Sequence, residues 1–152
     1  MMLNKEVRKY IEQSVLCWLA TSDKDNFPNV SPKEVFTHFE DKIIIANIAS
    51  PNSIHNSEEN NKVCVSFVDI FVQKGFKIKG RAKIIYKNDS DFDMKVKPLI
   101  DLYSDKFPIN AVIEITVQKV ESIQAPSYFL FPEITEEQQI QNALETYKVF
   151  KK

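Results

Sequence analysis

Residues 72–87 carry the pattern that most restricts how this chain can fold. Apolar and basic side chains alternate along the segment, and a period of two predicts a long β-strand with one face on the core. The protein's only two glycines, Gly75 and Gly80, both lie in this segment. A glycine inside a strand often marks a bulge, a bend or a close approach of another group. A long, bent strand is what a small β-barrel needs in order to close.

The remaining strand patterns predict a mostly antiparallel sheet around this segment. The predicted strands lie at about residues 16–21, 29–40, 42–48, 62–67 and 109–117. The strand 29–40 contains Pro32, which cannot donate to a ladder. We therefore expect that strand to lie at an edge or to be interrupted, which leaves backbone groups free to meet a flat ring.

Helical spacing of apolar residues predicts helices that flank the sheet. The first covers residues 3–15 and is expected to bury Leu3, Val7, Ile11 and Val15. A second covers residues 91–104, where Pro98 should kink or split it. Residues 121–133 form a connector rich in aromatics and proline, and Thr135 and Gln138 fit a capping box that starts a last helix.

Composition limits the class of protein. A chain of 152 residues with 43% hydrophobic residues is long enough for one domain with a real core, over residues 1–152. A net charge of −1 gives no electrostatic case for nucleic acid. The sequence has no apolar run of about 18 residues and no signal-peptide core, so a cytoplasmic location is expected.

The chemistry-bearing side chains are few. Cys17 and Cys64 lie in apolar strand patterns and are interpreted as reduced core residues. His38 and His55 are isolated, and no Cys/His cluster has metal-ligand spacing, so no metal site is expected. No residue is identified as a general acid or base.

The segment after the strand 42–48 can start a helix, with Ser50 as N-cap and Pro51 at the first helical position. A helix start with free N–H groups and small hydroxyl side chains can hold a phosphate. Plain capping is the alternative interpretation of the same residues.

The order of short motifs sharpens this picture. The motifs are Leu19-Ala20-Thr21, Asp23-Lys24-Asp25, Pro28-Asn29-Val30-Ser31-Pro32, the run from Asn47 to Ser53, Asn60-Asn61-Lys62-Val63, and Gly80-Arg81-Ala82. In this order they resemble the flavin-binding split-barrel family of pyridoxamine 5'-phosphate oxidase and the small FMN-binding proteins. The resemblance covers about residues 3–120, with a C-terminal connector and helix at 121–152. It implies a mainly β fold with flanking helices, a six-stranded antiparallel split β-barrel, that binds FMN as a homodimer with the flavin at the subunit interface.

The resemblance also implies which residues hold the cofactor. The expected contacts are Ser31, Pro32, Lys33 and Glu34 along the ring and ribityl chain, Asn47, Ile48, Ala49, Ser50, Asn52 and Ser53 around the ribityl and phosphate groups, and Gln73 and Lys74 from the neighbouring strand. Asn52 and Ser53 are neutral where the oxidases have basic residues, so Lys33 or Lys74 would supply the charge. The alternative for Lys33 is an exposed strand lysine in a weak surface pair with Glu34, and for Lys74 a solvated strand face.

Several functions fit these features. The first is a flavin-dependent oxidoreductase, in which the cofactor does the redox chemistry and the protein orients it. The second is a non-catalytic flavoprotein that stores FMN or transfers electrons. A third is a barrel that binds single-stranded nucleic acid through the basic face of residues 77–87. Related barrels also bind deazaflavin or haem. The chain ends without the arginine and histidine of the oxidases' substrate-gripping segment. The resemblance therefore supports FMN binding and the fold but not vitamin B6 oxidation.

Overall fold

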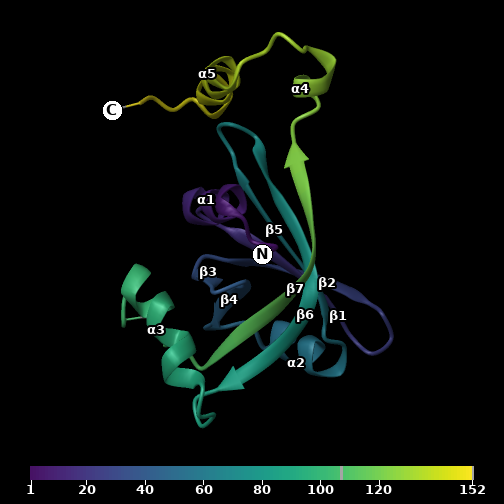
Figure 1. Ribbon diagram of the computed structural model, residues 1–152, viewed down its shortest axis with the longest axis vertical. Helices are drawn as coiled ribbons and strands as arrows, with labels where there is room; N and C mark the ends of the chain where they lie inside the picture. The colour runs from purple at the N-terminus through teal and green to yellow at the C-terminus, as the bar shows by residue number, and fades with distance from the viewer. Residues whose placement is uncertain (107, 152) are drawn as a thin grey trace.

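A seven-stranded antiparallel sheet forms the body of the protein in a computed structural model that describes residues 1–106 and 108–151 (Figure 1). The strands are β1 Cys17–Ser22, β2 Pro28–Lys33, β3 Phe36–Phe39, β4 Lys42–Asn47, β5 Lys62–Asp69, β6 Lys74–Tyr86 and β7 Ala111–Gln124. The helices are α1 Lys5–Gln13, α2 Pro51–Glu59, α3 Phe92–Leu102, α4 Ser127–Leu130 and α5 Glu136–Tyr147. The predicted mainly β fold with flanking helices is confirmed, with seven strands instead of six.

The extra strand comes from a break in the predicted strand 29–40. The sheet has the order β2-β1-β5-β6-β7-β4-β3, so its two edge strands, β2 and β3, are consecutive in the chain. Glu34 and Val35 join them, and the backbone N–H of Ala46 donates to the carbonyl of Val35 at 2.9 Å. The chain thus crosses from one edge of the sheet to the other and curls it into a half-barrel. Pro32 lies on an edge strand, as predicted.

The long strand β6 bends where the glycines lie. A Cβ atom added to Gly75 would lie 2.0 Å from the Phe67 carbonyl oxygen, and one added to Gly80 would lie 2.3 Å from that of Thr116. The pairing of β6 with β7 also shifts register between Lys79 and Gly80. Both glycines therefore permit close backbone approach, which confirms the interpretation of the sequence pattern.

The core lies on two sides of the curled sheet. One cluster packs α1 against the barrel interior and includes Leu3, Val7, Ile11, Leu19, Phe67 and Ile115. The other packs α3 against the sheet and includes Ile44, Ile85, Phe92, Val96, Leu99 and Val112. Pro98 lies inside α3 without splitting it. The prediction for Val15 was wrong, because α1 ends at Gln13 and the Val15 side chain is 82% exposed.

A buried ionic cluster fixes α3 to the sheet. Glu114 on β7 is only 4% exposed and lies 2.6 Å from Lys42 Nζ and 2.7 Å from Lys95 Nζ. Lys95, on α3, is itself 6% exposed, and its ammonium lies 4.1 Å from the centre of the Phe39 ring. Each buried charge in this cluster has a close partner, which is the condition under which burial of charge is tolerated.

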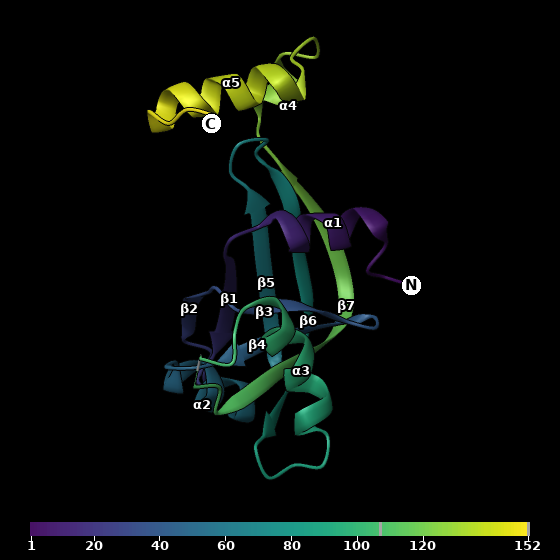
Figure 2. The same cartoon turned by 90° about the vertical axis from the view of Figure 1, so that its left-hand side faces the viewer.

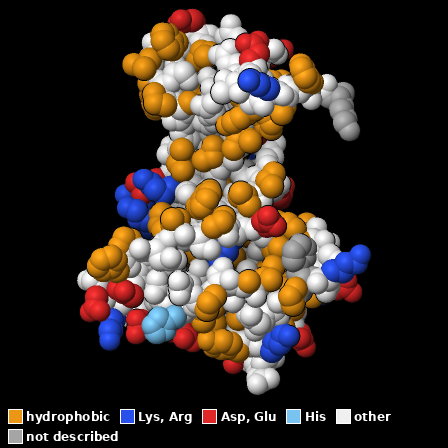
Figure 3. Space-filling model, turned by 180° about the vertical axis from the view of Figure 1, so that it is seen from behind, with side chains coloured by type: hydrophobic (Ala, Val, Ile, Leu, Met, Phe, Trp, Pro, Cys, Tyr) orange, Lys and Arg blue, Asp and Glu red, His pale blue; other side chains and the backbone are white. Residues whose placement is uncertain are grey.

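The C-terminal arm, residues 125–151, lies beyond the tip of the β5–β6 hairpin (Figure 2). β7 continues to Gln124, so the predicted strand end near residue 117 was wrong. The capping box at Thr135 and Gln138 is confirmed. Only Gln139 and Ala143 of α5 are buried, and apolar side chains gather at the surface over the arm (Figure 3). None of the helices in the described ranges is long and apolar enough to span a membrane.

Candidate functional site

A hollow of about 300 Å³ opens where the two edges of the sheet meet. We call it the Lys33 pocket. Its lining residues are Leu16, Pro32, Lys33, Glu34, Val35, Ala46, Ile48, Ala49 and Ser50. They come from the crossing between β2 and β3 and from the end of β4 as it enters α2. The barrel closure therefore brings together two segments that are separate in the sequence.

Lys33 is the unusual residue of this pocket. Its side chain is not on an open strand face but only 5% exposed, and its Nζ atom has no hydrogen-bond partner among the described residues. It pairs across the β1–β2 ladder with Cys17. Burial lowers the pKa of Lys33, and the neighbouring Cys17 thiol opposes this shift. A buried, unpaired ammonium costs free energy, and an anion bound beside it would offset that cost.

The start of α2 forms the polar end of the pocket. Ser50 occupies the N-cap position and Pro51 the first turn, as the sequence predicted. The Ser50 side chain makes no capping hydrogen bond, however, and its hydroxyl lies 3.4 Å from the hydroxyl of Ser31 on β2. Plain capping therefore does not account for Ser50. Ser31 itself does not line the pocket, but its hydroxyl lies next to an uncapped helix start, and such a start is suited to an anion.

The remaining predicted residues around α2 lie close by but face elsewhere. The Asn47 amide is buried and donates to Asn110 Oδ1 at 2.8 Å, which ties the end of β4 to the segment before β7. Asn52 is exposed on the first turn of α2. Ser53 is fully buried against the sheet, and its hydroxyl has no hydrogen-bond partner among the described residues.

Gln73 and Lys74 are not brought to the Lys33 pocket within one chain. They lie at the tip of the β5–β6 hairpin, at the opposite end of the molecule from α2 (Figures 1 and 2). The Lys74 ammonium pairs with Glu136 at 2.7 Å and lies 4.4 Å from the centre of the Tyr128 ring. The hydrogen bond to Glu136 raises the pKa of Lys74. In the single chain, this lysine therefore anchors the C-terminal arm.

Three pocket residues were absent from the sequence interpretation: Leu16, Val35 and Ala46. Leu16 precedes the first strand and carried no motif. Val35 and Ala46 meet only because the chain crosses between the two edges of the sheet. The sequence pattern of residues 29–40 predicted one continuous strand and gave no sign of this crossing. No group of three or more His, Cys, Asp or Glu side chains that could hold a metal ion occurs in the described ranges.

Comparison with known proteins identifies the family. Over residues 3–124 the chain matches the family described as pyridoxamine 5'-phosphate oxidase, and it belongs to that family. No curated protein matches the chain.

Solved structures share the fold. HupZ of Group A Streptococcus is 24% identical with a TM-score of 0.70, over 82% of this chain and 96% of that one. An FMN-binding protein of Syntrophomonas wolfei is 18% identical with a TM-score of 0.68, over 81% and 87%. HutZ, the heme storage protein of Vibrio cholerae, is 14% identical with a TM-score of 0.66, over 81% and 96%. At these identities the likeness establishes the fold.

Proposed function

We propose that this protein is a flavoprotein that binds FMN in the Lys33 pocket. The observation that carries the proposal is the buried, unpartnered ammonium of Lys33, a residue that lines one hollow together with Ser50 at the start of α2. An anionic group would satisfy the ammonium, the two serine hydroxyls and the free helix N–H groups together. FMN carries such a group, whereas riboflavin does not.

The donor set and the size of the pocket fit part of the cofactor. Cofactor pockets usually measure ~300–1,000 Å³, so an open hollow of about 300 Å³ would enclose only one portion of FMN. Ser31, Pro32, Lys33 and Glu34 would lie along it on one side, with Ile48, Ala49 and Ser50 on the other. Bound FMN would supply hydride or single-electron transfer, while these residues bind it and orient it.

The direct test is the chromophore itself. We expect purified protein to be yellow and to release FMN on denaturation, identified by chromatography, since the phosphate site suits a terminal monophosphate. Released FAD or a deazaflavin would correct the cofactor but keep the fold assignment. A colourless protein that does not perturb the FMN spectrum on titration would contradict the proposal.

Haem is the second candidate, because one structural neighbour is named a heme storage protein. Haem iron is normally held by His, Cys, Met or Tyr. None of the described residues that line the Lys33 pocket is of these types, which favours FMN. Titration with haemin separates the two, since an axial ligand from the protein gives a sharp Soret band whereas non-specific association does not.

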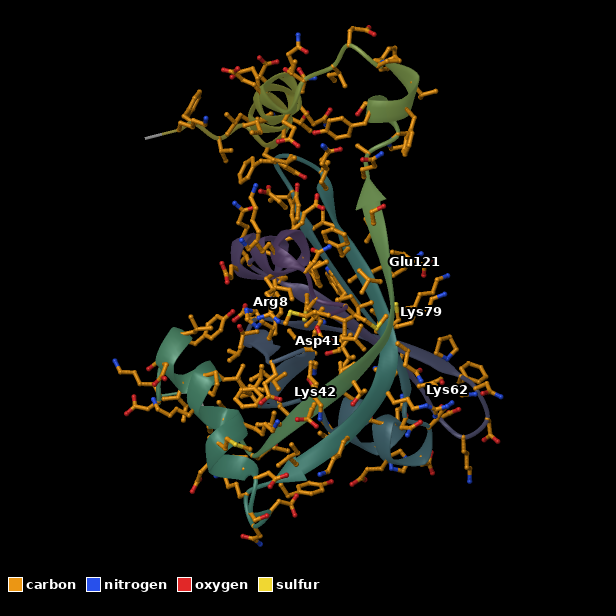
Figure 4. The ribbon with its side chains drawn as sticks, in the orientation of Figure 1. Arg8, Asp41, Lys42, Lys62, Lys79 and Glu121 are labelled. Carbon is orange, nitrogen blue, oxygen red and sulfur yellow. The ribbon has the colours of Figure 1, made fainter. Side chains whose placement is uncertain are left out.

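Bound FMN is compatible with two roles, catalysis and electron carriage. A flavin-dependent oxidoreductase would reoxidise a reduced nicotinamide or another organic donor with the FMN-loaded protein, while a carrier or electron-transfer protein would not turn over alone. The basic face of β6 supports single-stranded nucleic acid less well, because Glu121 lies 3.5 Å from Lys79 (Figure 4) and 3.3 Å from Lys119. The carboxylate offsets part of that charge.

We further propose a homodimer with the flavin at the subunit interface. The outer face of β6 and the α4 region are the contributing surfaces, and Phe129, Leu130 and Phe131 are 68%, 69% and 54% exposed. Exposed apolar groups of this size mark interaction sites, and a two-fold interface would bury them twice.

Light scattering at micromolar concentration is expected to give the mass of a dimer. The double replacement of Phe129 and Phe131 with serine should shift it toward monomer, whereas Phe27→Ser, a change at a 74% exposed position in another turn, should not. Wild-type protein that is monomeric with FMN bound would contradict this proposal.

A further inference from the structure

A second hollow, of about 380 Å³, lies beside the Lys33 pocket. We call it the Trp18 hollow. It is lined by Gln13, Val15, Leu16, Trp18, Ser66, Phe67, Val68, Asp69, Ile70 and Phe71. Leu16 lines both hollows, and Trp18 pairs across the β1–β2 ladder with Pro32 of the Lys33 pocket. The two spaces are therefore neighbours, joined at Leu16.

The walls of the Trp18 hollow are apolar side chains that the rest of the chain leaves uncovered. Val15 is 82% exposed, Ile70 52% and Trp18 46%. Trp18 pairs with Ser66 on β5, so a small side chain lies beside the indole and leaves room above it. An apolar, concave surface with an aromatic wall and few polar groups is typical of sites for small organic ligands.

The electrostatics of the hollow select a neutral ligand. No lysine or arginine occurs among the described residues that line it. Asp69 is its charged residue, and its carboxylate already accepts from the backbone N–H groups of Phe71 and Val72, at 2.9 and 3.3 Å. An anionic ligand would meet this negative charge without a compensating cation, in contrast to the Lys33 pocket next to it.

We propose that the Trp18 hollow binds a neutral, planar aromatic molecule of one or two rings, such as a quinone. Such a molecule would lie on the indole of Trp18 and against Phe71, where offset stacking is favourable. Its role as the reaction partner of the flavin rests on the proposed function, because the shared Leu16 sets it beside the Lys33 pocket. Its binding depends only on the hollow.

Trp18 is the only tryptophan of the chain, so intrinsic fluorescence reports on this hollow directly. The experiment titrates flavin-free protein with naphthoquinone and follows tryptophan emission. We expect quenching that saturates, and binding at least about tenfold weaker for naphthoquinone sulfonate, the anionic form of the same ring system. Quenching that rises linearly without saturation, equal for both compounds, would overturn the proposal.

Two variants make the test specific. Ser66→Phe fills the hollow at a strand position that tolerates an aromatic side chain, and Val15→Glu adds a charge at its exposed rim. Each should weaken naphthoquinone binding about tenfold or more, while the matched change Ser122→Phe, at an exposed position of β7, should not. If Ser66→Phe and Val15→Glu both bind naphthoquinone as tightly as wild type, the ligand binds elsewhere and the proposal fails.

The other occupants give different results. If a second copy covers the hollow, Trp18 emission shifts with protein concentration and no saturable quenching is seen, which overturns the proposal. FMN titration is run separately on the same variants. Saturable naphthoquinone binding by a protein that does not bind FMN would sustain the hollow as a ligand site and reject only the proposed flavin function.

Discussion

Replacing Glu114 with alanine is expected to lower the free energy of unfolding by about 3–5 kcal/mol. Glu114 is 4% exposed between two lysine ammoniums, and its loss would leave Lys95, 6% exposed, without a counter-charge. Removal of one member of a buried ion pair is costly because the other charge stays buried and unpaired. Urea unfolding followed by circular dichroism measures the loss.

Glu121→Ala is the matched control. Glu121, on β7, also lies between two lysines, Lys79 of β6 and Lys119 of β7, but its side chain is 29% exposed. Solvated ion pairs of this kind contribute little to stability, so the control should lose much less stability than Glu114→Ala. Equal losses for the two variants would show that α3 is not held by the buried cluster.

The Glu114 carboxyl group also predicts that the stability of the protein depends on pH. Burial by itself would raise the pKa of Glu114, but Lys42 and Lys95 together hold it below its ordinary value of 4.5. A lowered folded-state pKa contributes stability that is present above the unfolded pKa and is lost as pH falls through the folded one. The difference in unfolding free energy between wild type and Glu114→Gln should therefore shrink below pH 4.5. Parallel pH profiles would contradict this assignment.

Replacing Lys33 with methionine is expected to weaken FMN binding by about ten- to a hundredfold, or about 1.5–3 kcal/mol, the value of a charged hydrogen bond. Methionine keeps most of the buried stem and removes the unpartnered ammonium. Because an unpaired buried charge destabilises the fold, the variant should unfold at a higher temperature than flavin-free wild type. A gain in stability with a loss of affinity separates a binding role from a structural one.

Two further variants define the site around Lys33. Ser50→Ala should cost FMN affinity less, roughly 0.5–1.5 kcal/mol, and leave stability unchanged because its hydroxyl makes no capping bond. Lys87→Met, at an exposed position on another part of the chain, should change neither quantity. Fluorescence titration of flavin and thermal unfolding give both readings. Unaltered affinity in Lys33→Met would remove this lysine from the site.

Local patterns predicted the elements well because their causes are local. The alternation in β6, its two glycines and the Thr135 capping box depend on neighbours within a few residues, and the structure confirms them. The errors come from long-range contacts. The break at Glu34–Val35 follows from the crossing between sheet edges, and the length of β7 follows from its pairing with β6 as far as Lys74 opposite Gln124.

For the candidate site, too, some features could be predicted from local sequence and others depend on long-range contacts. The Ser31 and Ser50 hydroxyls lie 3.4 Å apart, and Lys33 and Ser50 line one hollow, since one barrel closure brings the segments together. Burial of Lys33 could not be read from a strand with alternating polar residues, because it depends on the closing edge. Lys74 looked similar to Lys33 in sequence, yet it pairs with Glu136 from a helix 62 residues later.

The comparison of FMN with riboflavin in wild-type protein tests the central claim most directly. The two ligands differ only in the phosphate, which we propose binds in the Lys33 pocket at the start of α2. We expect wild type to bind FMN at least about tenfold more tightly than riboflavin, and Lys33→Met to narrow that difference. Equal dissociation constants for the two flavins in wild type would contradict the assignment and leave residues 50–53 as an ordinary helix start.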